Sequence, residues 1–369
     1  MVFIVVVKLL KLKLKMTKNS RNTNQHVSIA LDAMGGDHGP KVVVPAALDV
    51  LKMHLNVRLI LVGDQEAIET EIKKCAGFDE SRLIIHHTSE EVKMDDSASQ
   101  ALRRKKDSSM RIAINMVKEN KAQACVSAGN TGALMAIARF VLRTLPGIDR
   151  PAIIYSMPIN VDKKQMGRMR MLDLGANVDC QAEHLFQFGV MGAILAEAVD
   201  GVSNPRVGLL NIGQEAIKGS DAVKKAAQLF ENSELNYIGF IEGTNLYQGD
   251  ADVVVCDGFV GNVALKCTEG VAHMLMQAIK FSFTQGWYAK FAAIIALPVL
   301  KKMAARAEPS QYNGATFLGL NGIVVKSHGN AKREGYKNAI LEAIHEGEQN
   351  IPERISVEVQ KTLGASNLA

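Results

Sequence analysis

Short apolar runs alternate with longer stretches of helical periodicity along most of the chain. The runs have the length of β-strands and contain few charged residues, whereas the stretches between them repeat apolar residues every three or four positions. This pattern is typical of an α/β protein with a mostly parallel sheet whose strands are buried on both faces. The predicted strands lie at 27–33, 57–62, 82–87, 124–126, 152–157, 169–174, 206–211, 236–241 and 252–256, and helices are predicted at 41–55, 65–75, 108–120 and 133–145.

A glycine-rich loop follows the fourth predicted strand and reads Ser127-Ala128-Gly129-Asn130-Thr131-Gly132. The apolar run at 124–126 precedes it, and a helical pattern from 133 to 145 follows it. Small side chains allow an anion to approach the backbone, and the unpaired N–H groups at a helix start point toward it. The loop therefore predicts a site for phosphate or a phosphorylated ligand.

Loops of the same kind follow other predicted strands. They are Met34-Gly35-Gly36-Asp37, Leu172-Asp173-Leu174-Gly175-Ala176-Asn177, Leu210-Asn211-Ile212-Gly213 and Cys256-Asp257-Gly258-Phe259-Val260-Gly261-Asn262. Ligands of open α/β sheets bind at the carboxyl ends of the strands. We therefore expect all of these loops to converge on one edge of the sheet.

Composition narrows the classes of function. The chain has 369 residues, of which 47% are hydrophobic, so it can bury a large core. The net charge of +5 fits a negatively charged partner, while 5% aromatic residues argue against a base-stacking nucleic-acid binder. Its five cysteines show no metal-binding spacing and are expected to be reduced thiols, and no metal site is expected.

Three segments stand outside the alternating pattern. Residues 1–26 are expected to form an extension outside the fold, with Met16 as the natural start; a basic surface anchor is the alternative for the first fifteen residues. Residues 27–350 are expected to form a single α/β domain, with a helical hairpin inserted at about 275–312. Residues 351–369 are assigned to a C-terminal tail.

The hairpin contains ten consecutive residues without a polar side chain, from Phe291 to Leu300. This run is shorter than the roughly 20 residues needed to span a bilayer. Two interpretations remain open: a buried hairpin or dimer contact, and a tip that dips into a lipid interface with aromatics at the boundary. The candidate membrane-contacting residues are Trp287, Phe291, Ile294, Ile295 and Leu297.

Six motifs occur in order: IALDAMGGDHGP, VSAGNTGALMA, LDLGANVDC, LLNIGQEAIKG, DVVVCDGFVGNVALKCTEG and VKSHGNA. Together they closely resemble the phosphate acyltransferase (PlsX) family of bacterial phospholipid synthesis, over about residues 27–345. The chain departs from the usual family pattern in two places. Ser97-Ala98 stand where the family commonly has Pro after Met94-Asp95-Asp96, and 311–318 also differs.

The resemblance implies a doubly wound α/β fold related to phosphotransacetylases and isocitrate-type dehydrogenases. It implies transfer of a long-chain acyl group from acyl carrier protein to inorganic phosphate, without a cofactor. The acyl phosphate product serves a membrane glycerol-3-phosphate acyltransferase. Family members are cytoplasmic homodimers that associate peripherally with the membrane, and no nucleic acid is involved.

This chemistry needs no protein nucleophile, because phosphate itself attacks the thioester, and no G-x-S-x-G motif is present. It needs an oriented phosphate, donors for the developing oxyanion and help for the leaving thiolate. The catalytic candidates are Asn130, Asn177, Lys266, His328 and Asp257. The phosphate- and substrate-binding candidates are Asp32, Gly35, Gly36, Ser127, Gly129, Thr131, Gly132, Gly175, Lys218, Gly258 and Asn262.

Structural roles are open for several of these residues. The aspartates that end strands are equally suited to capping the next helix, and the asparagines to forming turns. Lys218 lies three residues after Glu215, so the two side chains are candidates for a simple pair. His328 has glycine next to it and little core to fill, which favours protonation of the leaving sulfur or anion binding.

A basic run is the clearest charge feature. It comprises Arg103, Arg104, Lys105 and Lys106, and it is a candidate dock for the acidic carrier protein. Its plainer interpretation is a solvated helix face. A second candidate dock comprises Lys163, Lys164, Arg168 and Arg170.

Three other functions compete with the acyl-carrier reaction. A phosphotransacetylase that uses a coenzyme A thioester would share the phosphate site, although the apolar hairpin favours a long-chain substrate. A dehydrogenase is disfavoured, because no G-x-G-x-x-G follows the first strand. A membrane-recruited scaffold for lipid-synthesis enzymes would use the hairpin without needing the loops.

Overall fold

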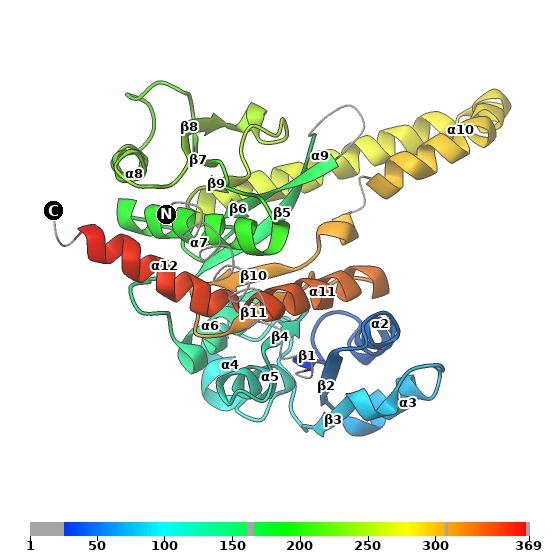
Figure 1. The fold of residues 1–369 in the computed structure, drawn as a ribbon. Helices are drawn as coiled ribbons and strands as arrows, with labels where there is room; N and C mark the ends of the chain where they lie inside the picture. The colour runs from blue at the N-terminus through cyan, green and yellow to red at the C-terminus, as the bar shows by residue number, and fades with distance from the viewer. Residues whose placement is uncertain (1–25, 161–165, 307–308, 367–369) are drawn as a thin grey trace, which may run out of the picture.

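Eleven strands form one sheet in the computed structural model, which describes residues 26–160, 166–306 and 309–366 (Figure 1). The strand order is β3-β2-β1-β4-β11-β10-β5-β6-β9-β7-β8. The first half of the sheet is parallel throughout. Its strands are β1 (Val27–Asp32), β2 (Val57–Gly63), β3 (Leu83–His87), β4 (Ala124–Ser127) and β11 (Ile323–Lys326).

The strand direction reverses across the middle of the sheet. Strand β10 is antiparallel to both β11 and β5, and β5 is antiparallel to β6; the strands beyond β6 are parallel to it. The strands are β10 (Ala315–Leu318), β5 (Ala152–Asn160), β6 (Met166–Leu172), β9 (Val253–Val255), β7 (Val207–Asn211) and β8 (Tyr237–Glu242). Our expectation of one converging set of loops was therefore wrong: the loops after β1, β4 and β11 form one group, and those after β6 and β9 form another.

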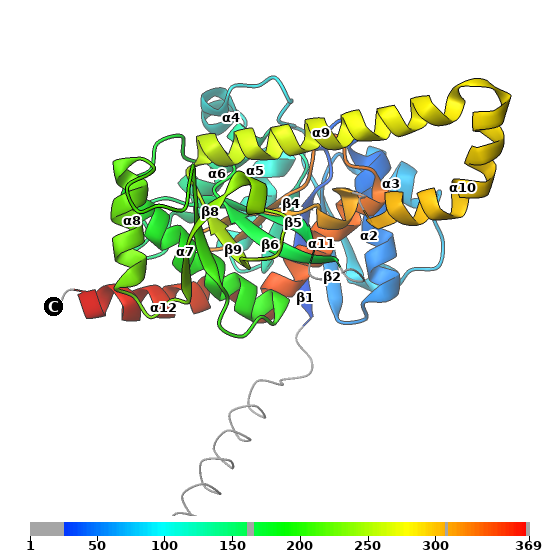
Figure 2. The ribbon, with the colours of Figure 1, turned by 90° about the horizontal axis from the view of Figure 1, so that it is seen from above.

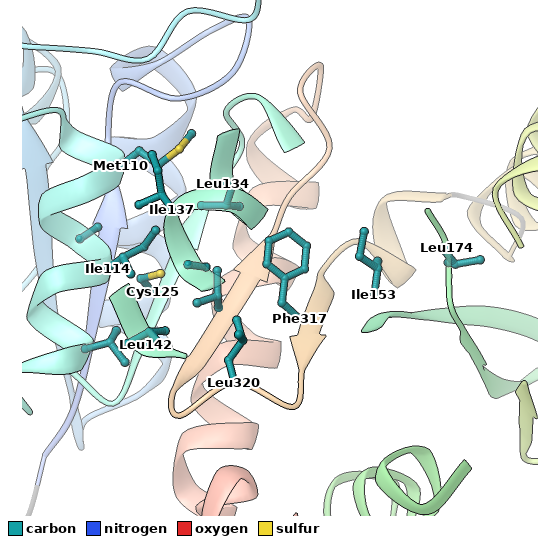
Figure 3. Packing of buried hydrophobic residues seen from close by; sticks show 14 of the residues in the cluster. Met110, Ile114, Cys125, Leu134, Ile137, Leu142, Ile153, Leu174, Phe317 and Leu320 are labelled. Carbon is teal, nitrogen blue, oxygen red and sulfur yellow. The ribbon is translucent and has the colours of Figure 1, made fainter. Parts of the chain in front are cut away.

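Helices cover both faces of the sheet because neighbouring strand residues point to opposite sides. In β1, Ala30 packs in one core cluster, whereas Ile29 and Leu31 pack in another. Figure 3 shows the first of these clusters, in which Met110, Ile114 and Ile137 meet Cys125 and Phe317. The helices over this face are α4 (Ala98–Arg104), α5 (Ser109–Lys118) and α6 (Thr131–Leu142).

The opposite face carries α2 (Pro40–Met53) and α11 (Arg333–Gln349) over the first half, and α7 (Ala182–Asp200) over the second. The remaining short elements are α3 (Gln65–Ile72), α8 (Asp221–Glu231) and the 3-10 turns η1 (Glu80–Arg82), η2 (Gly243–Asn245) and η3 (Pro309–Tyr312). The predicted strands are all present, with ends that shift by a few residues. Strands β10 and β11 and helix α4 were missed, because they are too short to show a period.

The segment assigned to a C-terminal tail instead contains helix α12 (Ile351–Ser366). Its apolar residues Ile351, Ile355 and Val359 are buried in the cluster that also contains α7. The spacing of four residues places all three on one helix face. The extension at 1–25 lies outside the described residues.

Helices α9 (Gly258–Thr284) and α10 (Gly286–Arg306) form a pair, called the arm here, that projects beyond the sheet (Figures 1 and 2). The arm begins at Gly258, earlier than the predicted 275, because Asp257 caps α9 directly after β9 by accepting a hydrogen bond from Val260 N at 2.8 Å. In α9 only Gly258 and Gly261 are buried. Within the described chain, no helix has the length and apolar character needed to cross a bilayer.

A buried ion cluster joins β6 to α7 and α11. Arg170, which is 1% exposed, donates from Nε and Nη2 to the two carboxylate oxygens of Asp200, each at 2.8 Å. Its Nη1 donates to Glu342 Oε1 at 2.5 Å. Arg170 is therefore part of the core and was wrongly included in the second candidate carrier dock.

Glu346 adds a fourth ionisable group beside this cluster. It is 0% exposed and accepts a hydrogen bond from Thr316 Oγ1 at 2.5 Å, while Oε2 has no hydrogen-bond partner among the described residues. Burial, reinforced by the negative charge of Glu342, raises the pKa of Glu346 to about 8. The folded protein thus keeps a proton here that the unfolded chain releases near its ordinary pKa of 4.5.

Glu346→Gln is expected to flatten the pH dependence of stability. Because the folded state binds the extra proton, the free energy of unfolding falls as pH rises from about 4.5 to about 8. Glutamine cannot bind or release this proton. Between about pH 6 and about pH 8.5 in urea titrations, the free energy of unfolding of the variant should therefore fall by at least about 1 kcal/mol less than that of wild type. Glu348→Gln, at an exposed position of α11, is the control; equal slopes for Glu346→Gln and wild type would contradict the assignment.

Candidate active site

The first loop group is built around the carboxylate of Asp32, at the end of β1. Asp32 is 1% exposed and accepts hydrogen bonds from Ser109 Oγ and Ser127 Oγ, both at 2.6 Å. Burial raises the pKa of Asp32, although these hydroxyls and the backbone N–H groups of Met34 and Gly35 act in the opposite direction. Asp32 thereby ties the start of α5 to the loops after β1 and β4.

Glycines are required where these loops touch. A Cβ on Gly35 would lie 2.5 Å from Asp32 Oδ2 and 2.8 Å from the backbone nitrogen of Gly129. Gly36 has a φ of 87°, and a Cβ there would lie 2.9 Å from the carbonyl oxygen of Gly329. Gly35 and Gly36 therefore allow the three loops to pack closely, while the predicted role of Gly35, Gly36 and Gly129 in phosphate binding stays a prediction.

The third loop of this group follows β11. Ser327 N donates to Ser127 O, and Asp37 N donates to Gly329 O, each at 2.9 Å. The loops after β1, β4 and β11 are thus joined by backbone hydrogen bonds. This arrangement follows from the pairing order, because β4 lies between β1 and β11 and all three strands are parallel.

Lys326, the last residue of β11, is a site residue that sequence reasoning missed. It is 9% exposed, and its Nζ donates to Ala128 O at 3.2 Å and also to Ser327 O. Burial lowers the pKa of Lys326 to about 8, against the opposing charges of Asp32 and Asp37. The available signal was a lysine ending the apolar run Ile323–Lys326, directly before the Ser-His-Gly loop.

Asn130 acts as a cap and a tether in this structure. Its Oδ1 accepts a hydrogen bond from Ala133 N at 2.9 Å, and its Nδ2 donates to the carbonyl oxygens of Met94 and Asp96 at 2.7 and 3.1 Å. Both donors of the amide are engaged, which argues against our prediction that Asn130 donates to an oxyanion. Thr131 and Gly132, in the first turn of α6, are exposed and leave this helix start open to an anion.

The second loop group is centred on Asp173, which is 0% exposed. Asp173 accepts hydrogen bonds from the backbone of Ile153 and Ala176, and both the backbone and Nδ2 of Asn177 donate to Oδ2. Burial raises the pKa of Asp173. Asn177 Nδ2 also donates to Pro151 O at 2.8 Å, so this amide is buried and hydrogen-bonded within the protein. This agrees with the alternative that Asn177 has a structural role in the turn.

Gly258 and Gly175 bring α9 against this second group. Gly258 N donates to Asn177 O at 2.7 Å, and Asp257 caps α9 as the structural alternative anticipated. A Cβ on Gly175 would lie 3.7 Å from Asn262 Cβ, and Asn262 itself is exposed. The contacts of Gly258 with Asn177 and of Gly175 with Asn262 therefore join the loops after β6 and β9.

The remaining candidates lie at the surface. Lys266 pairs with Glu269 at 2.9 Å, and Lys218 pairs with Glu215 at 3.2 Å, as the alternative for Lys218 foresaw. His328 is exposed; its backbone N–H donates to Asn313 Oδ1 at 3.0 Å. Of these side chains, only that of His328 belongs to the first loop group.

The basic run divides into two parts. Arg103 and Arg104, in the last turn of α4, are exposed, as is Lys106 just beyond it. Lys105 instead donates to the Asp96 carboxylate at 2.5 Å and to Glu91 O at 2.8 Å, so its inclusion in an exposed dock was wrong. In the second candidate dock, Arg168 is 48% exposed, and Lys163 and Lys164 lie outside the described residues.

The first group combines the features that anion chemistry requires. It has an open helix start, close backbone approach and a buried ammonium group. Within the described residues, no group of three or more His, Cys, Asp or Glu side chains is placed to hold a metal ion. The arrangement suits an anionic nucleophile that is bound and oriented by the protein.

Several proteins similar to this chain are phosphate acyltransferases. Residues 27–354 match a family model described as "Fatty acid synthesis protein". A phosphate acyltransferase from Coxiella burnetii is 57% identical over 339 residues, which cover 91% of this chain and 97% of the relative. One from Nitrosococcus oceani is 56% identical over 337 residues, which cover 91% of this chain and 98% of the relative.

Solved structures of the same fold include a phosphotransacetylase from Streptococcus pyogenes, with a TM-score of 0.58, 17% identity and coverage of 90% of this chain and 98% of that one. The EutD phosphotransacetylase from Staphylococcus aureus has a TM-score of 0.55, 18% identity and coverage of 88% and 95%. At this identity the likeness shows the fold alone, and it confirms the predicted doubly wound α/β class. Since the family model and relatives above half identity span most of its length, the chain belongs to the phosphate acyltransferase family and is an enzyme of the acyltransferase class.

Proposed function

We propose that this enzyme transfers a long-chain acyl group from acyl carrier protein to inorganic phosphate. The observation that carries the proposal is the meeting of three loops at the buried Asp32, beside the open start of α6. Phosphate held there attacks the thioester carbonyl: a P–O–C linkage forms, the C–S bond breaks, and the proton of the phosphate passes to the leaving sulfur. The acyl phosphate then serves a membrane glycerol-3-phosphate acyltransferase in phospholipid synthesis.

Helix α4 is the proposed dock for the carrier. Arg103, Arg104 and Lys106 expose positive charge, and the same segment reaches the phosphate loop through Asn130, which donates to Met94 O and Asp96 O. Acyl carrier protein is acidic, so it is attracted to this surface. A carrier bound at α4 would lie close to the proposed phosphate site.

Charge reversal in the double variant Arg103→Glu and Arg104→Glu is expected to raise KM for the acyl carrier at least about tenfold at low salt. KM for phosphate should change little, because neither side chain lies in the three loops. The salt dependence of kcat/KM should also weaken, since fewer opposite charges are screened. The matched control is Lys224→Glu with Lys225→Glu on α8; the same KM in both double variants would remove α4 as the dock.

The exposed apolar side chains of the arm support the proposal that the enzyme forms a homodimer and binds the membrane peripherally. Along α9, Val260, Val263, Val271, Met274 and Phe281 are exposed at intervals that keep them on one stripe, which fits a second copy of the chain. On α10, Trp287 is 82% exposed and Ile294 70%. Apolar and aromatic side chains on one exposed helix suit the interface of a bilayer. The exposed candidate residues of α10 are Trp287, Phe291, Ile294, Ile295 and Leu297.

Phe291→Glu combined with Ile294→Glu is expected to reduce co-sedimentation with phosphatidylglycerol-containing vesicles at least about fivefold, because charged side chains resist transfer to the interface. The dimer mass in light scattering should stay that of wild type. Val357→Glu, at an exposed apolar position of α12, is the control. Conversion to a monomer with unchanged vesicle binding would assign these residues to the dimer contact instead.

The reaction itself is tested with palmitoyl-acyl carrier protein, with and without orthophosphate, by trapping acyl phosphate as a hydroxamate. Phosphate-dependent hydroxamate and free carrier are expected. A signal only from acetyl-coenzyme A would favour the second candidate, a phosphotransacetylase, which the fold likeness to two phosphotransacetylases supports. If neither donor gave a hydroxamate, the result would favour a membrane-recruited scaffold that uses the arm.

A further inference from the structure

Lys326 is a buried cation without an ion-pair partner among the described residues. Lys326 lies next to the loop after β4, because it pairs in register with Ser127, the last residue of β4. Its two hydrogen-bond acceptors, Ala128 O and Ser327 O, are neutral carbonyl groups. Among the described residues, no carboxylate lies within 4.0 Å of its Nζ, although Asp32 and Asp37 are near enough to act on it electrostatically. A buried charge in this state lacks the partner that usually offsets its desolvation.

The ammonium group also has unused hydrogen-bonding capacity. It carries three donors, of which two are accounted for by the two carbonyls. Both carbonyls belong to residues within the joined loops, so the ammonium group lies where these loops meet. The same loop leads into the start of α6, where Thr131 and Gly132 are exposed. A small anion is the ligand that suits a buried cation beside an open helix start.

We propose that Lys326 binds the substrate phosphate through its third N–H and supplies the counter-charge to it, an inference that rests on the proposed function. In this role the phosphate completes the hydrogen bonding of Nζ and brings a negative charge into direct contact with the ammonium group. The carbonyls of Ala128 and Ser327 hold the ammonium group in place, so the phosphate is positioned relative to the start of α6. Arg103, Arg104 and Lys106 have no part in this contact.

A pH signature follows from the burial of Lys326. Its pKa of about 8 in the free protein means that the cation is lost as pH rises through that value. The nearby Cys125 and Tyr336 stay protonated in this range, because burial raises their pKa. Burial raises the pKa of Asp32, which exerts its charge on Lys326 from β1. Phosphate affinity should therefore fall as pH increases beyond about 8.

The test is calorimetric binding of inorganic phosphate to the full chain, without any acyl donor. Lys326→Met, which keeps the length and apolar stem, is expected to raise Kd for phosphate at least about tenfold, the loss typical of one charge-assisted hydrogen bond. Lys337→Met is the matched control, because Lys337 is 15% exposed but pairs with Glu334. Unfolding by urea establishes that each variant is folded.

The wild-type protein provides a second measurement that does not depend on a variant. Phosphate Kd should rise at least about threefold from about pH 7.5 to about pH 9.5, a range in which the dianion is the main form of phosphate, and Lys326→Met should show no such rise. A constant wild-type Kd, undetectable binding, or wild-type affinity in folded Lys326→Met would each overturn the proposal. The hydroxamate assay is separate: phosphate binding with no transfer from the carrier would reject the proposed donor and leave Lys326 in its role.

Discussion

Gly35→Ala is expected to lower kcat/KM at least about 100-fold, the loss that a displacement of about 1 Å at a reacting group can cause. The new Cβ would lie 2.5 Å from Asp32 Oδ2 and 2.8 Å from Gly129 N. The carboxylate cannot yield easily, because the Ser109 and Ser127 hydroxyls hold it in the core. The loop after β4 must shift instead. Steady-state assay of phosphate-dependent acyl transfer measures this effect.

Two further glycine variants make the result specific. Gly129→Ala should have a smaller effect, because its Cβ would meet chiefly Met110 Cε, the end of a flexible side chain. Gly243→Ala in η2 meets nothing within 4 Å and should be as active as wild type. Full activity of Gly35→Ala, with unchanged unfolding, would mean that the close packing of the two loops is not needed for catalysis.

Arg170→Met is expected to destabilise the fold by about 3–5 kcal/mol, because it leaves buried carboxylates without their cation. Arg170 is 1% exposed and holds Asp200 on α7 and Glu342 on α11, and its removal also exposes Glu346 to more negative charge. The free energy of unfolding from urea titration at neutral pH is the appropriate measure. Activity at low temperature should persist in the folded fraction, since the cluster lies outside the loops.

Arg168→Met provides the matched control two residues earlier on the same strand. Arg168 is 48% exposed and lies 3.5 Å from Asp200, so its loss should cost about 1 kcal/mol or less. If Arg170→Met lowered the free energy of unfolding by as little as Arg168→Met, the carboxylates of Asp200 and Glu342 would have to avoid mutual repulsion by binding protons. The pKa of Glu346, already raised, makes it the first group expected to do so.

The sequence predicted the elements of the fold well because burial acts on every strand. Strands β1, β2 and β4 are covered on both faces, so each reads as a continuous apolar run. Strands β10 and β11 have four residues each and pair with each other, whereas their other partners in the sheet, β5 and β4, lie far away in the chain. Such short runs show no clear period, so our sequence reasoning missed them. Without them, the reversal of strand direction could not be predicted either.

The site was predicted less well, because a residue type does not reveal what its side chain will contact. Asn130 and Asn177 have the right chemistry for an oxyanion, yet their amides are occupied by carbonyl and carboxylate groups of other segments. Lys105 resembles its basic neighbours in sequence but is paired with Asp96. Lys326 was not singled out in the sequence, and only its burial makes it unusual.

The sequence by itself determined the α/β class, the glycine-rich loops after the strands and the family, because periodicity and ordered motifs are properties of the chain alone. Only the tertiary structure decided which loops meet, that Asp32 joins them, and that Lys326 is buried among them without an ion-pair partner in the described part of the chain. The physical reason is that strand pairing brings together residues far apart in the chain, and desolvation and hydrogen bonding at that meeting point set the chemistry of each group.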